Sequence, residues 1–300
     1  MYYSQLNKNL FLINLDQKIE GFRNFVSSWL YKDRDTAFLI DPGPIYSIDV
    51  LKESLNEIGI KKLDYILLTH IHIDHAGGTG ELLKNFPDTK IICPEKGIKH
   101  LINPAKLWQG SLNVLGEVAM AYGEISAVPQ DRFCNIKKIK TGGDTIEIIE
   151  TPGHAAHHNC YIFKEYLFAG EVAGVCQPLL DKIYTRPATP PKFILEIWLN
   201  SLNKVIERKP SVICYGHYGT NNNALQALHS SKEQIFLWID VIKEQMTKDA
   251  INIEEGIIEN LMKKDRLFSN YKYLDNDIKK RESFFIKNSI KGIIKYFEMT

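Results

Sequence analysis

The sequence lacks the features that would associate it with a membrane, a nucleic acid or secretion. No apolar run approaches the length of a membrane span, and the N-terminus has no basic segment followed by an apolar one. Lysine and arginine number 37 against 36 aspartates and glutamates, so the net charge of +1 gives no general attraction for nucleic acid or an anionic membrane. We therefore expect a cytoplasmic protein with neither a nucleic-acid nor a membrane partner.

Paired cysteines and the motif of a serine nucleophile are also missing. The five cysteines are widely scattered and none belongs to a CxxC pair, which favours reduced and mostly buried thiols. There is no Gly-x-Ser-x-Gly elbow and no cysteine beside a base, so no protein nucleophile is expected. A hydrophobic content of 44% over 300 residues is enough for a real core, either as one large domain or as a domain with an extension.

Histidine, in contrast, is concentrated in one short stretch. Three imidazoles and one carboxylate lie within six residues, directly after the apolar run 65–68, in the order Thr69-His70-Ile71-His72-Ile73-Asp74-His75. Ordinary polar loops rarely reach this density, and so many polar groups are hard to bury without a metal ion to receive their lone pairs. The stretch therefore predicts a metal site.

The local pattern divides these side chains into two pairs. If the extended run at 65–68 continues through residue 72, His70 and His72 point the same way and could bind one ion. Small and glycine residues follow the stretch, so the chain must turn there. In that turn, Asp74 and His75 could face a second ion.

Strands and helices alternate through the first part of the chain. Helical spacing of apolar residues predicts helices at 47–58 and 81–86. Short apolar runs rich in aromatic and branched residues predict strands at 10–15, 25–31, 36–40, 65–68, 90–93, 136–149 (with a turn at 141–144), 161–163, 166–169 and 212–215. This alternation indicates a layered α/β architecture.

Side chains that can ligate a metal follow four of these predicted strands. Besides the stretch 69–75, they are His154, Glu171 and His217, and four strand ends that meet at one sheet edge would build a metal centre on a rigid scaffold. Asp41 also ends a strand, directly before a Pro-Gly turn. It either caps that turn or orients a histidine that binds metal.

Two segments do not follow the alternation. At 97–132, helical spacing predicts a helical pair packed on the core, or else a roof over the site that offers Trp108 or Tyr122 to an apolar substrate. At 221–300 no ligand cluster occurs, and His229 is expected to be a surface or packing residue. This second segment predicts a helical extension that packs on the core, covers the site or forms a homodimer, with helices at 224–248, 254–262 and 279–297.

The histidine and carboxylate pattern resembles the metallo-β-lactamase superfamily. The resemblance covers roughly residues 10–220 and rests on His70-x-His72-x-Asp74-His75, followed by His154, an acid at 171 and His217. It implies an α/β fold, a four-layer αββα sandwich of two mixed sheets faced by helices, with the site at one edge. We accordingly expect this domain over residues 1–220 and a C-terminal helical extension over 221–300.

The resemblance also implies a set of ligands for two divalent ions, zinc above all, with iron or manganese as alternatives. The first ion would be held by His70, His72 and His154, and the second by Asp74, His75 and His217. Glu171 would bridge them. The family usually has aspartate there, within a Gly-Asp pair. Here Gly170 is followed by glutamate, one methylene longer, so the backbone must sit farther back or the carboxylate must coordinate differently.

The activity that the resemblance implies is metal-dependent hydrolysis of a small molecule. A metal-bridged hydroxide would attack a thioester, lactone or related ester, and Asp74 would orient this nucleophile or shuttle its proton. The pair Asp74-His75 looks like the branch that includes glyoxalase II and lactonases, while the length and helical tail resemble the quinolone-signalling thioesterases. The alternatives are a mononuclear iron dioxygenase of the persulfide-oxidising type, which would leave Asp74 and His75 unbound, and a ligand sensor with a vestigial metal site.

Five further residues are candidates for supporting the site or binding substrate. Asp41 is the first. Of the adjacent His157 and His158 at most one can face the metals, and we favour His158, with a packing histidine as the alternative. The others are predicted to line a substrate cleft, Arg186 as a bidentate anchor for a carboxylate or phosphate unless it is a surface residue; they are Tyr184, Arg186 and Tyr218.

Overall fold

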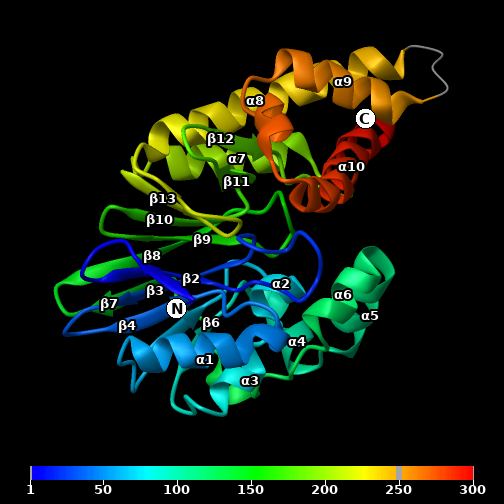
Figure 1. Ribbon diagram of the computed structural model, residues 1–300. Helices are drawn as coiled ribbons and strands as arrows, with labels where there is room; N and C mark the ends of the chain where they lie inside the picture. The colour runs from blue at the N-terminus through cyan, green and yellow to red at the C-terminus, as the bar shows by residue number, and fades with distance from the viewer. Residues whose placement is uncertain (1, 248–251, 300) are drawn as a thin grey trace.

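The computed structural model describes residues 2–247 and 252–299. Within these residues, two six-stranded mixed sheets pack face to face and helices cover both outer faces, as Figure 1 shows. The predicted αββα sandwich with a helical C-terminal region is therefore confirmed.

The first sheet follows the chain order. Its first four strands form an antiparallel meander, and its last three run parallel; in order they are β1 (Tyr3–Gln5), β2 (Leu10–Asn14), β3 (Ser27–Lys32), β4 (Ala37–Ile40), β5 (Tyr65–Leu67) and β6 (Lys90–Ile92). Ile40 stands opposite Leu67 in the parallel pair β4–β5. Asp41 and Thr69 therefore emerge at the same edge of the sheet.

The second sheet brings the other ligand-bearing loops to that side of the molecule. In order across the sheet its strands are β14 (Thr220–Asn221), β13 (Val212–Tyr215), β10 (Tyr166–Gly170), β9 (Asn159–Phe163), β8 (Asp144–Glu150) and β7 (Lys138–Thr141). Gly170 of β10 pairs in parallel with Tyr215 of β13, so Glu171 and His217 follow neighbouring strand ends. β8 runs in the same direction as β10, since both are antiparallel to β9.

Helices cover the first sheet and extend beside the site. α1 and α3 pack on the sheet, α2 follows β5, and three helices occupy the segment after β6; they are α1 (Ile48–Glu57), α2 (Ile73–Ala76), α3 (Thr79–Leu83), α4 (Glu95–Ile102), α5 (Ala105–Leu115) and α6 (Glu117–Tyr122). The segment 97–132 thus contains three helices instead of the predicted pair. Its apolar residues, Trp108 among them, pack on the core of the first sheet, which supports the packing interpretation.

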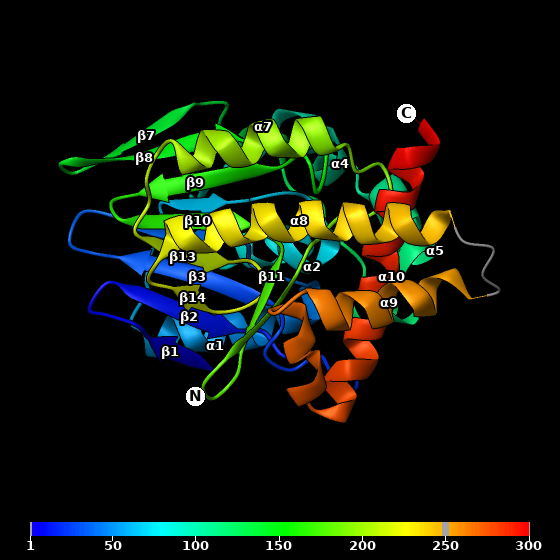
Figure 2. The same cartoon turned by 90° about the horizontal axis from the view of Figure 1, so that it is seen from above.

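The second sheet is covered by the C-terminal half of the chain. Figure 2 shows α7 and α8 lying side by side above it, with α10 crossing near the end of α8; these helices are α7 (Leu195–Ile206), α8 (Ala224–Met246), α9 (Ile253–Lys264) and α10 (Asn276–Met299). One apolar cluster joins Ile213 of the sheet to Trp238 of α8 and Ile290 of α10. The C-terminal helices therefore pack on the sandwich. The domain boundary at 220 and a homodimer through these helices stay predictions.

Several features differ from the sequence prediction. The strand that precedes the histidines ends at Leu67 and does not continue through His72, because the Thr69 amide donates to the Asp41 carboxylate instead of to a strand. The helix α7 was not predicted, and neither was the hairpin of β11 (Val175–Pro178) and β12 (Ile183–Arg186). None of the described helices is long and apolar enough to cross a membrane.

Candidate metal centre

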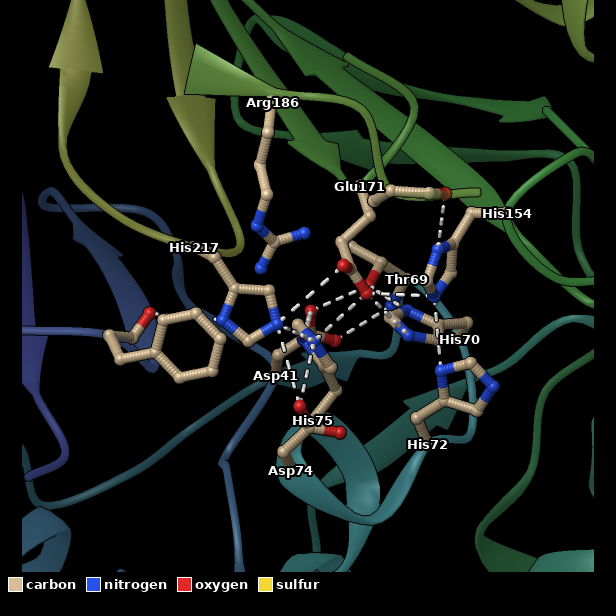
Figure 3. A network of polar contacts seen from close by, with 12 residues as sticks. Asp41, Thr69, His70, His72, Asp74, His75, His154, Glu171, Arg186 and His217 are labelled. Carbon is tan, nitrogen blue, oxygen red and sulfur yellow. Dashed lines mark hydrogen bonds and ion pairs between the residues drawn. The ribbon is translucent and has the colours of Figure 1, made fainter. Parts of the chain in front are cut away.

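The seven predicted ligands meet at one edge of the sandwich, as Figure 3 shows. Their ligating atoms form two groups, each within 4.8 Å: His70, His72, His154 and Glu171 in one, and Asp74, His75 and His217 in the other. The loop after β5 carries His70 and His72, whereas Asp74 and His75 lie on the short helix α2. Helix α2, and not a turn, thus carries the second pair.

Glu171 lies between the two groups. Its Oε2 is 2.8 Å from His154 Nε2, 3.4 Å from His70 Nε2 and 3.6 Å from His75 Nε2. Its Oε1 is 3.7 Å from His217 Nε2. The longer glutamate side chain therefore reaches the space between both sets of nitrogens, where a shared ligand would have to be.

Three of the imidazoles are held so that Nε2 points into the site. Nδ1 of His75 is 3.0 Å from Asp41 Oδ2, Nδ1 of His154 is 2.9 Å from the Ala188 carbonyl oxygen, and Nδ1 of His217 is 3.0 Å from the Phe25 carbonyl oxygen. An Nδ1–H that donates to such an acceptor leaves Nε2 as a free lone pair.

The nitrogens at the centre of the site face other imidazole nitrogens and carboxylate oxygens. Nε2 of His70 is buried without a hydrogen-bond partner among the described residues. The Nε2 atoms of His75 and His217 face each other at 3.2 Å, and His154 Nε2 lies 3.1 Å from His72 Nδ1. Converging imidazole nitrogens and carboxylates are the ligands that zinc and related divalent ions prefer, so the residues fit the implied metals.

The electrostatics of the site favour the ligating protonation states for most of these groups. Burial lowers the pKa of His70 well below its ordinary value and that of His72 to about 3, so both rings are neutral near pH 7. Burial opposes ionisation of Asp74, but His75 and His217 lower its pKa to about 2. Burial also disfavours a charged His75, yet Asp74 and Asp41 raise its pKa to about 9. A cation would therefore have to displace a proton from His75.

Comparison with known proteins gives the family. Residues 21–217 match the sequence model described as the metallo-beta-lactamase superfamily. This chain belongs to the metallo-β-lactamase superfamily. It is 32% identical over 193 residues to the metallo-beta-lactamase fold-containing protein ST1585 of Sulfurisphaera tokodaii, covering 61% of this chain and 72% of that protein. It is 30% identical over 149 residues to a hydroxyacylglutathione hydrolase of Buchnera aphidicola, covering 47% of this chain and 44% of that enzyme.

Solved structures of the superfamily share the fold over nearly the whole chain. The crystal structure of ST1585 superimposes with a TM-score of 0.70 and 24% identity, over 96% of this chain and 99% of that one. The metallo-β-lactamase family protein TTHA1429 from Thermus thermophilus superimposes with a TM-score of 0.67 and 17% identity, over 98% and 95% of the two chains. The C-terminal helices of this chain lie within the superimposed length.

Asp41 orients two of the candidate ligand histidines. Its Oδ1 accepts from the Thr69 amide at 2.7 Å, and its Oδ2 accepts from the Thr69 hydroxyl at 2.6 Å and faces His75 Nδ1. Because that hydroxyl donates to Asp41, it can accept from His70 Nδ1, 3.0 Å away. Asp41 has a φ of 50°, a left-handed conformation that aspartate tolerates better than most residues. Of the two interpretations of Asp41, these contacts support the orienting role.

His158 supports Glu171 from the second sheet. Its Nε2 accepts from the Glu171 amide at 3.1 Å, and its Nδ1 lies 2.8 Å from the Thr151 hydroxyl. Both ring nitrogens are thereby engaged, so His158 holds the backbone of a candidate ligand and does not itself ligate. His157 is only partly buried and lies beside the His72 ring, with 5.9 Å between centroids.

Of the three predicted substrate residues, the structure contradicts the prediction for Tyr184. Tyr184 does not line a cleft: it is fully buried under α10, where its hydroxyl donates to Glu282 at 3.0 Å. Tyr218, which follows His217, is partly buried and packs against the apolar core between the sheets. Arg186 is not a surface residue, since only 3% of it is exposed; it extends from β12 toward Glu171 and His217 (Figure 3).

Several residues at the site were not predicted from the sequence. Phe25 stacks on the His217 ring, with 4.1 Å between centroids, and the Arg281 guanidinium lies 4.1 Å from the Phe25 ring centroid. Arg281 and Glu282 belong to α10, more than sixty residues after His217. One signal was available: Glu282 lies four residues from both Ile278 and Ile286 on the apolar stripe, where a carboxylate must be buried and paired.

Proposed function

We propose that this protein is a dinuclear metal-dependent hydrolase that cleaves a thioester, or a lactone or related ester, of a small molecule. The observation that carries the proposal is the pair of ligand groups with Glu171 between them. Two bound divalent cations would supply an activated water and polarise the carbonyl oxygen of the substrate. Zinc fits the imidazole-rich donor set.

The chain's own residues would prepare the site for this chemistry. Asp41, Ala188 and Phe25 accept the Nδ1–H groups of three histidines, so the Nε2 atoms of these rings point into the site before any ion arrives, and a cation has to displace the Nε2 proton of His75. Asp74 is buried and is almost fully ionised at all moderate pH values, because its pKa is about 2. Such a carboxylate is a weak base, so it would orient the attacking water by accepting a hydrogen bond.

The contacts of Asp74 and His75 favour this proposal over a mononuclear dioxygenase. In a mononuclear site both side chains would be superfluous. Here His75 Nε2 is 3.2 Å from His217 Nε2, and Asp74 Oδ2 is 3.4 Å from the same atom. Burying three such groups together is costly without a cation. The choice of a thioester draws on the hydroxyacylglutathione hydrolases of Buchnera aphidicola and Salmonella typhi, 30% and 26% identical to this chain.

The test is metal content combined with a hydrolysis screen. Purified protein loaded with zinc, manganese or iron should hold about two ions per chain by elemental analysis and should hydrolyse at least one thioester, lactone or ester. His75→Ala should lose one ion and most of the activity, whereas His229→Ala, at an exposed histidine on α8, should lose neither. One iron per chain with oxygen consumption would overturn the proposal, and so would a metal-replete protein that hydrolyses none of these bonds.

A further inference from the structure

A buried arginine projects into the candidate site from the second sheet. Arg186 ends β12, and its side chain extends toward Glu171 and His217 in Figure 3. Its Nε donates to Glu282 Oε2 at 2.5 Å, and its Nη1 makes a longer contact of 3.3 Å with the Pro187 carbonyl oxygen. Among the described residues, no hydrogen bond engages its Nη2. One edge of the guanidinium is therefore available to a ligand.

The charges around Arg186 are not balanced. Glu282 is shared: its Oε2 serves Arg186 and the Tyr184 hydroxyl, while its Oε1 accepts from Arg281 Nε at 3.0 Å. The other Arg281 contacts are neutral oxygens of Gly21, Arg23 and Gln177. Two buried guanidinium groups thus share one carboxylate, and an unbalanced buried charge is expensive unless a counter-ion reaches it.

The carboxylates of the candidate site do not solve this imbalance in a metal-loaded protein. Glu171 and Asp74 both belong to the candidate ligand sets, where their charge would be shared with cations. A guanidinium held beside two bound cations favours the binding of a negatively charged ligand. The free edge of the Arg186 guanidinium, with two N–H groups in one plane, suits two oxygens of one anion.

We propose that Arg186 anchors an anionic group of the substrate, a carboxylate in the simplest case, carried on the acyl or leaving side of the bond that is cleaved. Glu282 of α10 is a positioning residue that holds the guanidinium over the ligands. This inference rests on the proposed hydrolase function and adds a substrate class to it. A purely structural Arg186 would only tie β12 to α10.

Matched substrates separate the anchor from a structural role. The zinc-loaded full chain is assayed by thiol release on two pairs of thioesters: butanoyl against succinyl on one neutral thiol, and acetyl esters of mercaptoethanol against mercaptoacetate. At least one anionic member should exceed its neutral partner in kcat/KM by about 10- to 100-fold, mostly through KM. Arg186→Gln should remove this preference and leave hydrolysis of the neutral partners within about threefold of the parent, as expected for a contact to a remote group.

Two further variants control for folding. Arg208→Gln removes an exposed arginine whose Nη2 is 2.9 Å from Glu147, and it should keep the preference. Arg186→Gln leaves Glu282 paired with Arg281 Nε at 3.0 Å, so this variant creates no unpaired buried charge. It should fold, as followed by thermal unfolding, and lack the preference. Glu282→Gln should raise KM for the anionic thioesters while kcat for the neutral ones is retained.

A binding measurement separates this inference from the proposed function. Calorimetry should show glutarate binding to the zinc-loaded protein at least tenfold more tightly than its monoamide, and Arg186→Gln should abolish the difference. If no thioester, lactone or ester is hydrolysed, the proposed function fails, and the calorimetry still decides on the anchor. Equal affinity for the two probes, or an equal loss of kcat on all four thioesters in Arg186→Gln, overturns the anchor even if hydrolysis is observed.

Discussion

Replacing Asp41 by asparagine tests whether this carboxylate prepares the histidines for metal. Asparagine has the same shape and also tolerates a positive φ, so the backbone conformation at this position is retained. Its carbonyl oxygen can still accept from the Thr69 amide. Its NH2 group, however, replaces the oxygen that faces the Thr69 hydroxyl at 2.6 Å and His75 Nδ1 at 3.0 Å. The His75 ring then meets a donor instead of an acceptor.

The magnitude follows from the two contacts that are lost. A hydrogen bond to a charged group contributes about 1.5–3 kcal/mol, so the metal-free variant should lose about 3–6 kcal/mol of unfolding free energy in urea. Loss of such an orienting contact typically lowers metal affinity by about 10- to 100-fold. The ion held by Asp74, His75 and His217 should be lost first, since Asp41 contacts His75 directly. Competition with a chromophoric chelator, together with elemental analysis, measures this loss.

Asp33→Asn is the matched control. Asp33 also accepts three hydrogen bonds, from the amides of Asp35 and Thr36 and from the Tyr31 hydroxyl, but it lies at the opposite end of β4 from the site. Its variant should lose some stability and bind zinc as the parent does. If Asp41→Asn also binds two zinc ions with parental affinity, Asp41 is only a turn cap and the reasoning fails.

Three other variants probe buried groups near the site. His158→Phe removes the acceptor of the Glu171 amide and should cost about 1–3 kcal/mol of unfolding free energy together with zinc affinity; unchanged zinc binding would contradict it. Tyr122→Phe should leave the unfolding free energy equal or higher by about 1 kcal/mol, because the buried Tyr122 hydroxyl has no partner among the described residues. A clear destabilisation in urea would show that the hydroxyl is in fact satisfied. Burial opposes ionisation of Glu282, but Arg186 and Arg281 lower its pKa to about 2, so its contribution to stability is complete above the ordinary value of 4.5 and is lost as pH falls from 4.5 toward 2. Acid unfolding of Glu282→Gln should therefore be less steep in this range than that of the parent, and identical profiles would refute the assignment.

The ligands could be predicted from the sequence because their signal is local. The loops that hold the candidate ligands follow apolar strands. The carboxyl ends of parallel strands lie at one edge of a sheet, as those of β4 and β5 and those of β10 and β13 do. The geometry within these loops was harder to predict. The strand β5 ends at Leu67 and does not continue through Thr69, whose amide donates to the Asp41 side chain, 28 residues earlier in the chain. No periodicity in the stretch 69–75 reports such a contact.

The residues around the ligands depend on packing between distant segments. The sequence predicts that Tyr184 lines a substrate cleft, yet its hydroxyl is buried against Glu282, 98 residues later. Phe25 supports His217 through its ring and its carbonyl oxygen, with 192 residues between them. Neither contact produces a pattern in a single sequence, because each joins segments that are far apart in the chain. The sequence of α10 indicates an amphipathic helix but not where that helix packs on the sandwich.

The shared carboxylate of Glu282 also has a consequence for biosynthesis. Glu282 follows Arg186 by 96 residues, which corresponds to about 5–20 s of translation. The candidate ligands on α2 and on the second sheet are therefore synthesised well before α10, whose Glu282 pairs with Arg186. In this interval Arg186 lacks its carboxylate partner, although α7 and α8, which cover the second sheet, have already been synthesised. A nascent chain stalled before α10 could already carry every candidate metal ligand and still lack the guanidinium geometry on which substrate selection would depend.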